Sequence, residues 1–194
     1  MNKSDTKTRL LDMAETLARQ NGAEGFSYSD LSAEIGIRKA SIHYHFPTKS
    51  DLLSALIARY AQTVLERLRV VQDDLPSAAE RIDGFIALYR DAIGEGDCLC
   101  LCVAYALSPD VLNKATRDCV SAFRRDVLAW LRSVFETGLC DGTINDISTP
   151  EKEASAALAL VEGAQIAARF SESAAHYDKA VASFRDRLIL GQSE

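Results

Sequence analysis

The chain has 194 residues, of which 47% are apolar and 26% charged, a composition that is ordinary for a folded protein and excludes intrinsic disorder as a class. Its formal net charge of −6 argues against a protein that coats nucleic acid. The charge is uneven, because residues 1–50 hold seven Lys or Arg and six Asp or Glu, whereas residues 51–194 hold fifteen and twenty-two. A polyanion is therefore expected to bind only near the N-terminal end.

No segment is suited to a membrane or to export. The chain has no run of about 18 uncharged apolar residues, and its opening, MNKSDTKTRL, leads into no apolar secretory stretch. We therefore expect a cytoplasmic protein with no membrane partner. An odd number of cysteines in such a chain indicates thiols rather than a disulfide framework; they are Cys98, Cys100, Cys102, Cys119 and Cys140.

Helical patterns run the length of the chain. Apolar residues recur at spacings of three and four, and no segment alternates convincingly with a period of two. A Ser or Thr followed three residues later by an acid, which is typical of a helix start, occurs at Ser27/Asp30, Thr48/Asp51, Ser77/Glu80 and Ser148/Glu151. The sequence predicts an all-α fold of about nine helices, over 5–21, 28–35, 39–45, 49–73, 77–94, 98–108, 111–138, 149–171 and 174–190.

Residues 27–46 form two short predicted helices separated by Gly36, with a longer helix before them. This is the outline of a helix-turn-helix, whose second helix enters the DNA major groove. Ile42 and Phe46 lie one turn apart and are expected to pack on Leu17, Leu31 and Ile35. The opposite face of the second helix then presents Ala40, Ser41 and Tyr44, flanked by Arg38, Lys39, His43 and His45.

The stretch from Arg38 to Lys49 has three Lys or Arg and no acid in an otherwise acidic chain. Small residues allow close approach to base edges, and Arg or Lys can bind guanine or phosphate. A solvated amphipathic helix hairpin has the same spacing, so the spacing leaves both interpretations open. A metal site is not expected, because neither His43 nor His45 has a Cys or carboxylate at ligand spacing.

The stretch IGIRKASIHYHFPTKSDLL, with GAEGFSYSDLSAEIG before it, closely resembles the N-terminal DNA-binding domain of the TetR family of transcriptional regulators. The resemblance is strong over about residues 5–55 and rests on a glycine turn, a short helix with two aromatics near its end, a proline breaker and a following Lys. It implies a DNA-binding domain over 1–48 and a helical effector-binding and dimerisation domain over 49–194, linked by helix 49–73.

The resemblance also implies which side chains touch DNA. Lys39, Ala40, Ser41 and Tyr44 would face bases or their sugar-phosphate rims, while His45 and Lys49, with Ser27, Tyr28 or Ser29, would contact phosphates. His43 departs from the family, in which many members carry Tyr, and this difference affects part of the operator preference. Tyr28 has a structural alternative, in which it caps the helix bundle.

The segment DCLCLCVAYAL, residues 97–107, is unusually rich in cysteine. On a helix, Cys98 and Cys102 share one face and Cys100 lies on the other, so the three cannot converge on one metal. Cysteine also serves as a small apolar core residue, which is the preferred interpretation for at least two of them. Cys98, expected near a helix N-terminus, is the best candidate for a reactive thiol, and some electrophile-responsive TetR-like regulators resemble this segment.

The family resemblance places an effector pocket among the middle helices, about residues 77–138. Core packing is the alternative role for most of the candidates, which are Phe85, Tyr89, Cys98, Cys102, Tyr105, Phe123, Trp130 and Phe135. No nucleophile–base arrangement, phosphate-binding glycine loop or pair of carboxylates is visible. We therefore expect a binding protein with no catalytic residues and no cofactor.

Small residues along helix 149–171 suggest a close helix contact between two copies of the chain, although they also suit a helix inside the monomer. The proposed interface residues are Ala157, Gly163, Ala164, Ala167 and Ala168. The predicted function is a homodimeric, ligand-responsive repressor, released from palindromic double-stranded operator DNA by a small molecule, an electrophile or thiol modification. The alternatives are an activator with the same DNA-binding domain, a helical metal- or thiol-binding protein, and a small helical enzyme.

Overall fold

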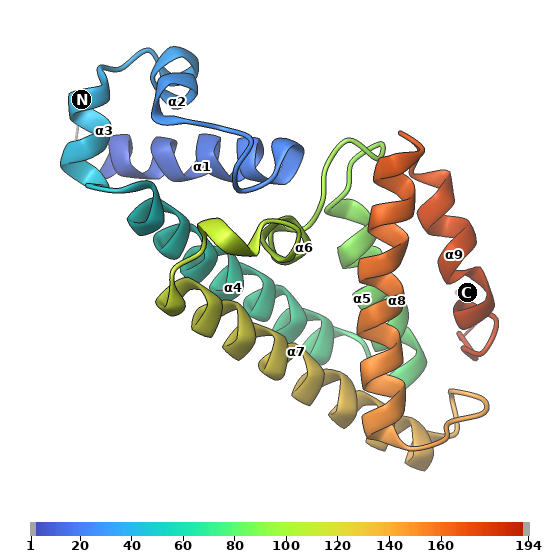
Figure 1. Ribbon diagram of the computed structural model, residues 1–194. Helices are drawn as coiled ribbons and strands as arrows, with labels where there is room; N and C mark the ends of the chain where they lie inside the picture. Colours follow the sequence, from blue (N-terminus) through green and yellow to red (C-terminus); the bar gives the residue numbers. More distant parts are fainter. Residues whose placement is uncertain (1–2, 192–194) are drawn as a thin grey trace. The chain divides into compact units, whose positions relative to one another are not determined.

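A computed structural model describes residues 3–191, and the side chains from residue 5 onward. The described residues form nine α-helices, one short 3₁₀-helix and no strand, which confirms the predicted all-α fold (Figure 1). Within this part of the chain, no helix is long and apolar enough to cross a membrane. The elements are α1 (Lys3–Asn21), α2 (Tyr28–Ile35), α3 (Lys39–His45), α4 (Lys49–Asp74), α5 (Ala78–Asp91), α6 (Leu101–Ala106), η1 (Pro109–Val111), α7 (Lys114–Asp141), α8 (Pro150–Phe170) and α9 (Ala175–Arg185).

The helices belong to two compact units. Unit 1 comprises residues 1–62 and 101–122, and unit 2 comprises residues 63–100 and 123–194. Helices α4 and α7 each contribute residues to both units. The functional boundary expected after residue 48 falls inside unit 1 and stays a prediction.

The core of unit 1 is built where α1, α2 and α3 pack together. Leu10, Leu31 and Ile42 are completely buried, and Phe46 is nearly so. Leu17 and Ile35 are half-buried, and their expected contacts with Ile42 and Phe46 stay predictions. The side of α1 that carries Leu10, Ala14 and Ala18 is completely buried.

The cysteine segment differs from the helix predicted over 98–108. Residues 92–97 form turns, residues 98–100 are not helical, and α6 begins only at Leu101. Cys98 therefore lies before the helix rather than in its first turn, and the expected effect of the helix dipole on its thiol does not apply. A long-range hydrogen bond holds this turn, because the Ala174 N–H donates to the Glu95 carbonyl oxygen at 3.0 Å. Gly96, whose φ is +105°, has no room for a side chain, since a Cβ would lie 2.7 Å from the backbone nitrogen of Ser173.

Unit 2 contains the pair α8 and α9, which lie side by side, with α5 packed against both (Figure 1). The hydroxyl of the fully buried Tyr177 donates a hydrogen bond to the carbonyl oxygen of Ile86 at 2.8 Å. Burial raises the pKa of Tyr177. Arg185 of α9 also binds Asp83 of α5 at 2.7 Å, so both polar and apolar contacts hold α9 on α5.

The N-terminus of α5 is capped by the end of α7. The Asp141 carboxylate accepts a hydrogen bond from the Ala78 backbone N–H at 2.9 Å, and the Thr143 hydroxyl oxygen accepts one from Ala79. Partial burial raises the pKa of Asp141, but hydrogen bonds from Ala78 and Thr143 outweigh this effect and leave the pKa below its usual value. Asp141 is thus more stable as the anion in the folded chain.

We expect Asp141→Asn to lower the Tm at pH 7 by about 1–3 °C, because a carboxylate at a helix N-terminus contributes about 0.3–1 kcal/mol and solvent screens an exposed one. The pKa of Asp141 is lower in the folded chain than in the unfolded chain, where it is near 3.9, so the ionised carboxylate stabilises the fold at pH values above 3.9. This contribution disappears as the pH falls through the pKa of the folded chain. Thermal unfolding from pH 7 to pH 3 should therefore show the two Tm curves converging in acid. A difference that is constant with pH would contradict this account.

Candidate nucleic-acid interface

Helix α2 begins with a complete capping box. The Ser27 hydroxyl oxygen accepts hydrogen bonds from the Ser29 and Asp30 amides, and both the Ser27 hydroxyl and its backbone N–H donate to the Asp30 carboxylate, at 2.8 and 2.7 Å. These bonds hold the pKa of Asp30 below its usual value. Because the Ser27 hydroxyl proton is already donated, Ser27 positions α2, while Ser29 is exposed in its first turn. Their predicted phosphate contacts stay predictions.

A glycine turn joins α2 to α3. Gly36 adopts a left-handed φ of 72°, which glycine reaches without strain, and its N–H donates to the Ser32 carbonyl. The Ser32 hydroxyl donates to the carbonyl of Ile37 at 2.6 Å. This turn sets the direction of α3 relative to α2, as a helix-turn-helix requires.

Helix α3 presents the predicted base-reading residues to solvent. Its buried side chain is Ile42, and Phe46 follows directly after its end. Tyr44 is 66% exposed. The other candidates of this helix and its N-cap are also exposed, namely Arg38, Lys39, Ala40, Ser41 and His43. His45 is half-buried. Ala40, Ser41, Tyr44 and His45 also line a shallow open groove with Thr6 and Ile37.

Tyr28 ties the start of α2 to the end of α3. Its hydroxyl donates a hydrogen bond to the Phe46 carbonyl at 2.8 Å, and its ring meets the edge of the His43 ring at a centroid distance of 4.9 Å. Burial, followed by the nearby Asp51 carboxylate, raises the pKa of Tyr28 to about 12. The side chain thus has the bundle-capping geometry weighed as the alternative to a phosphate contact, and the phosphate contact stays a prediction.

His43 is oriented by a backbone carbonyl. Its Nδ1 lies 3.2 Å from the carbonyl oxygen of Pro47. A carbonyl can only accept, so Nδ1 carries the proton in this hydrogen bond, and Nε2 of the neutral ring is left as an acceptor. The ring is therefore suited to accept a hydrogen bond from an amino group through a nitrogen atom, whereas Tyr at this position would present a hydroxyl group.

Lys49 binds the loop before α2. Its Nζ donates to the carbonyl oxygens of Phe26 and of Glu24, the latter at 3.4 Å, and lies 4.3 Å from the centroid of the Phe26 ring. Burial lowers the pKa of this ammonium group. Two of its three N–H donors are therefore directed at the protein, and its predicted phosphate contact stays a prediction.

The candidate effector residues are divided between the two units. In unit 2, the rings of Phe85 and Tyr89 are 4.7 Å apart and those of Phe85 and Trp130 are 6.0 Å apart. Cys102 and Tyr105 belong to unit 1, where the buried Tyr105 hydroxyl donates to the Leu53 carbonyl at 3.0 Å. The remaining candidates of unit 2 are Phe123 and Phe135, which are buried, and Cys98, which is half-buried.

Sequence reasoning missed Gln165, a completely buried amide on α8 whose Oε1 accepts a hydrogen bond from the Cys100 backbone N–H at 2.7 Å. The signal available was one amide among the Ala, Val and Leu residues of an apolar helix face.

None of the five cysteines is part of a disulfide bond in the described residues. Across residues 3–191, no group of three His, Cys, Asp or Glu side chains is arranged to hold a metal ion.

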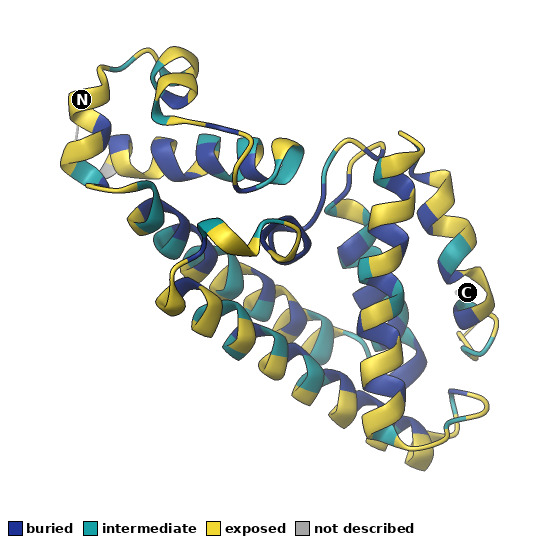
Figure 2. Cartoon of the chain, viewed as in Figure 1, coloured by how far each residue is buried: buried dark blue, intermediate teal, exposed yellow. Residues whose placement is uncertain are grey.

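The small residues of α8 divide between two faces. Ala157, Ala164 and Ala168 are at most 3% exposed and pack inside unit 2. The expectation that these three contact a partner therefore needs correction, because the chain's own helices already cover them. Gly163 and Ala167 are exposed, and they share their face with Ile166 and Phe170, which are 44% and 90% exposed. Figure 2 shows this division of α8 into buried and exposed sides.

Residues 10–56 match the family model for bacterial regulatory proteins of the tetR family. Over nearly the whole chain, the structure is similar to a crystal structure of a TetR family transcriptional regulator from Agrobacterium tumefaciens, with 30% sequence identity, a TM-score of 0.90, and coverage of 96% of this chain and 99% of that one.

The chain belongs to the TetR family of transcriptional regulators.

Two further similarities are more distant. The fold is similar to that of a cysteine mutant of the TetR family regulator CifR, complexed with 26bp double-strand operator DNA, at a TM-score of 0.75 and 23% identity over 93% of this chain and 95% of that one. Nucleoid occlusion factor SlmA of Shewanella woodyi is 23% identical over 86 residues. That match spans 44% of this chain and 44% of SlmA, so the chain matches less than half the length of this curated relative.

Proposed function

We propose that this TetR family protein is a homodimeric repressor that binds a palindromic double-stranded DNA operator through α3 and leaves it when an effector binds. The observation that carries the proposal is the solvent-facing surface of α3, with Lys39, Ser41 and Tyr44 exposed and no acid in the helix. The operator-bound structure of the CifR mutant supports it, because that protein shares this fold. We propose that the protein acts in the cytoplasm and by binding rather than by catalysis.

The side chains of α3 suggest how bases are read. Arg38 and Lys39 can donate to guanine or to phosphate, while Ser41 and Tyr44 can reach base edges past the small Ala40. The Nε2 acceptor of His43 suits the amino group of adenine or cytosine. Half-buried His45 would contact the backbone beside this surface.

The test of this function is selection of bound duplexes from a random pool, followed by affinity measurements on the selected operator. We expect Lys39→Ala and Tyr44→Ala to weaken binding by about 1–3 kcal/mol at the bases that they contact and to relax the sequence preference there. Lys114→Ala is a charge-matched control, because Lys114 is exposed on α7 and pairs with Asp118. Unchanged sequence preference in both α3 variants would overturn the assignment of α3 as the reading helix.

We place the proposed dimer contact on the exposed face of α8. A Cβ at Gly163 would have no atom within 4 Å in the monomer, although glycine costs about 1 kcal/mol in the middle of a helix. A partner helix that approaches closely would give this glycine a packing role. The same partner would also cover the exposed Phe170 ring on this face of α8. Two copies related by a two-fold axis would then present two α3 helices to a palindromic site.

We propose that the effector acts within unit 2, where the rings of Phe85, Tyr89 and Trp130 form a continuous aromatic group. Phe123 is buried on α7 in the same unit. For an electrophile, the proposed target in this unit is the half-buried Cys98, although Cys140 of the same unit is exposed. Cys102 and Tyr105, which lie in unit 1, are better explained by core packing. Release of the selected operator on addition of a small molecule distinguishes a ligand-responsive repressor from an activator that stays bound.

A further inference from the structure

The amide of Gln165 is held in one orientation inside unit 2. The residue has no exposed surface, and its Oε1 accepts the hydrogen bond from the Cys100 N–H. Because an N–H cannot donate to an NH₂ group, this bond fixes Oε1 toward Cys100 and Nε2 at the other end. Nε2 is buried and has no hydrogen-bond partner within the part of the chain that the structure describes.

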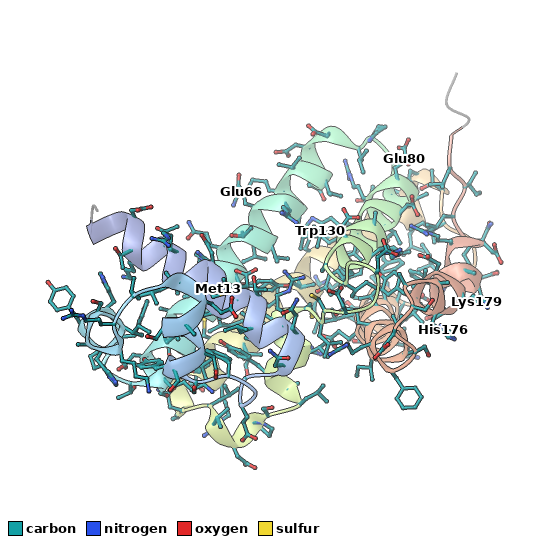
Figure 3. The ribbon with its side chains drawn as sticks, turned by 90° about the horizontal axis from the view of Figure 1, so that it is seen from above. Met13, Glu66, Glu80, Trp130, His176 and Lys179 are labelled. Carbon is teal, nitrogen blue, oxygen red and sulfur yellow. The ribbon has the colours of Figure 1, made fainter. Side chains whose placement is uncertain are left out.

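A second donor in the same unit has the same property. The indole Nε1 of Trp130, which is labelled in Figure 3, is buried without a hydrogen-bond partner among the described residues. The Trp130 ring lies 6.0 Å from that of Phe85 on α5. Helix α8, which carries Gln165, also packs against α5. The interior of unit 2 around α5 therefore combines aromatic surface with two N–H groups that lack acceptors.

Buried donors without acceptors are unfavourable, because folding removes their hydrogen bonds to water. We propose that Gln165 Nε2 and Trp130 Nε1 are the polar anchors of the effector site, and that they bind a neutral, mainly aromatic ligand carrying a hydrogen-bond acceptor such as a ketone, aldehyde or quinone carbonyl. This inference rests on the proposed ligand response and specifies the chemistry of the ligand.

The charges of unit 2 favour a neutral ligand over an ionic one. Three arginines on the helices around α5 are already paired with carboxylates, Arg124 with Glu162, Arg90 with Asp178 and Arg185 with Asp83. An ionised ligand would lose its hydration on entering the core without gaining a counter-charge. A carbonyl oxygen needs only the N–H donors that the two side chains supply.

The experiment compares acetophenone with α-methylstyrene, which has a similar shape but a CH₂ group in place of the carbonyl oxygen. Trp130 is the only tryptophan of the chain, so a ¹H–¹⁵N spectrum of the full-length protein contains one indole cross-peak that reports directly on Nε1. We expect acetophenone to bind roughly fivefold more tightly than α-methylstyrene and to move this cross-peak downfield. The hydrocarbon should cause no comparable downfield shift.

Two variants test the role of the amide. Gln165→Met and Gln165→Leu each remove the Nε2 donor and leave an apolar side chain of similar size. Both should reduce the preference for acetophenone to less than twofold. Gln72→Met is the matched control, because the buried Gln72 atom that lacks a hydrogen-bond partner among the described residues is the acceptor Oε1 rather than a donor. This variant should keep the full preference for acetophenone.

The proposal is overturned if the wild-type protein binds neither probe, if it binds both equally, or if the preference for acetophenone survives in the folded Gln165 variants. The operator selection described above uses no small molecule. Failure of the anchor proposal therefore leaves DNA binding untouched, whereas failure to select any operator would refute the regulatory function itself.

Discussion

Replacing Gly163 with Arg is expected to convert the proposed dimer into a folded monomer that no longer holds its operator. Apart from the neighbouring backbone of α8 itself, no atom of the described chain lies within 4 Å of the new Cβ, so the monomer can accommodate the substitution. In a close contact between two α8 helices, however, the charged side chain would be buried without a partner, at a cost of several kcal/mol. Sedimentation should show a monomer, and operator affinity should fall about 100-fold or more.

Two arginine variants serve as controls for this result. Ala164→Arg places the same side chain one residue further along, at a position only 3% exposed, and should fail to fold. Ala129→Arg, at an exposed alanine of α7, should stay dimeric and bind the operator normally. A Gly163→Arg protein that is dimeric with unchanged operator affinity would show that the interface lies elsewhere.

Replacing Lys49 with Ala is expected to weaken operator binding roughly tenfold without changing its dependence on salt. The Lys49 ammonium group holds the Glu24 and Phe26 carbonyls and the Phe26 ring, and a hydrogen bond to a charged group contributes about 1.5–3 kcal/mol. Its loss should loosen the segment that leads into α2 and so misplace α3. A residue that acts by positioning releases no counterions, so the slope of log K against log salt should stay the same.

Lys39→Ala is the comparison for this experiment, because Lys39 is an exposed cation of α3. If Lys39 binds a phosphate, its removal should reduce the salt slope by about 0.9. A similar reduction in Lys49→Ala would show that Lys49 binds a phosphate directly, as the family resemblance implies. Unfolding curves of both variants separate loss of stability from loss of contact, since only Lys49→Ala should lower the Tm.

Local hydrogen-bond patterns explain why much of the fold could be predicted from the sequence. The signatures at Ser27/Asp30, Thr48/Asp51 and Ser77/Glu80 all form the expected reciprocal hydrogen bonds. The bounds expected for α2 and α3 also agree with the structure. These features depend on residues at most four positions apart, which the sequence displays directly.

The fourth helix-start signature was wrong in detail. Pro150 occupies the first turn of α8, so the residue before it, Thr149, is the N-cap and accepts from the Lys152 N–H. Ser148 instead donates to the Glu153 carboxylate. A proline at the helix start was therefore a more specific signal than the Ser/Glu spacing.

The remaining differences depend on contacts between distant residues. Gly96 forms its turn against Ser173, and nothing near Cys98 in the sequence shows that contact. The alanines of α8 lie on two sides of the helix, and a small-residue pattern does not tell which side faces the chain's own core. The position of Gln165 between Cys100 and the interior likewise depends on a pairing of residues 65 positions apart.

The side chains that hold the helix-turn-helix come mostly from outside α3. Arg9 of α1 donates to the Ile35 carbonyl at the end of α2, Lys49 of α4 binds the Phe26 carbonyl, and Tyr28 of α2 binds Phe46. From α3 itself, only Ile42 is buried. The residues that position α3 and the exposed residues of α3 that face DNA can thus change independently in evolution. A duplicated gene could therefore acquire a new target site by exchanging a few exposed residues of α3, while the stability of the DNA-binding domain stays unchanged.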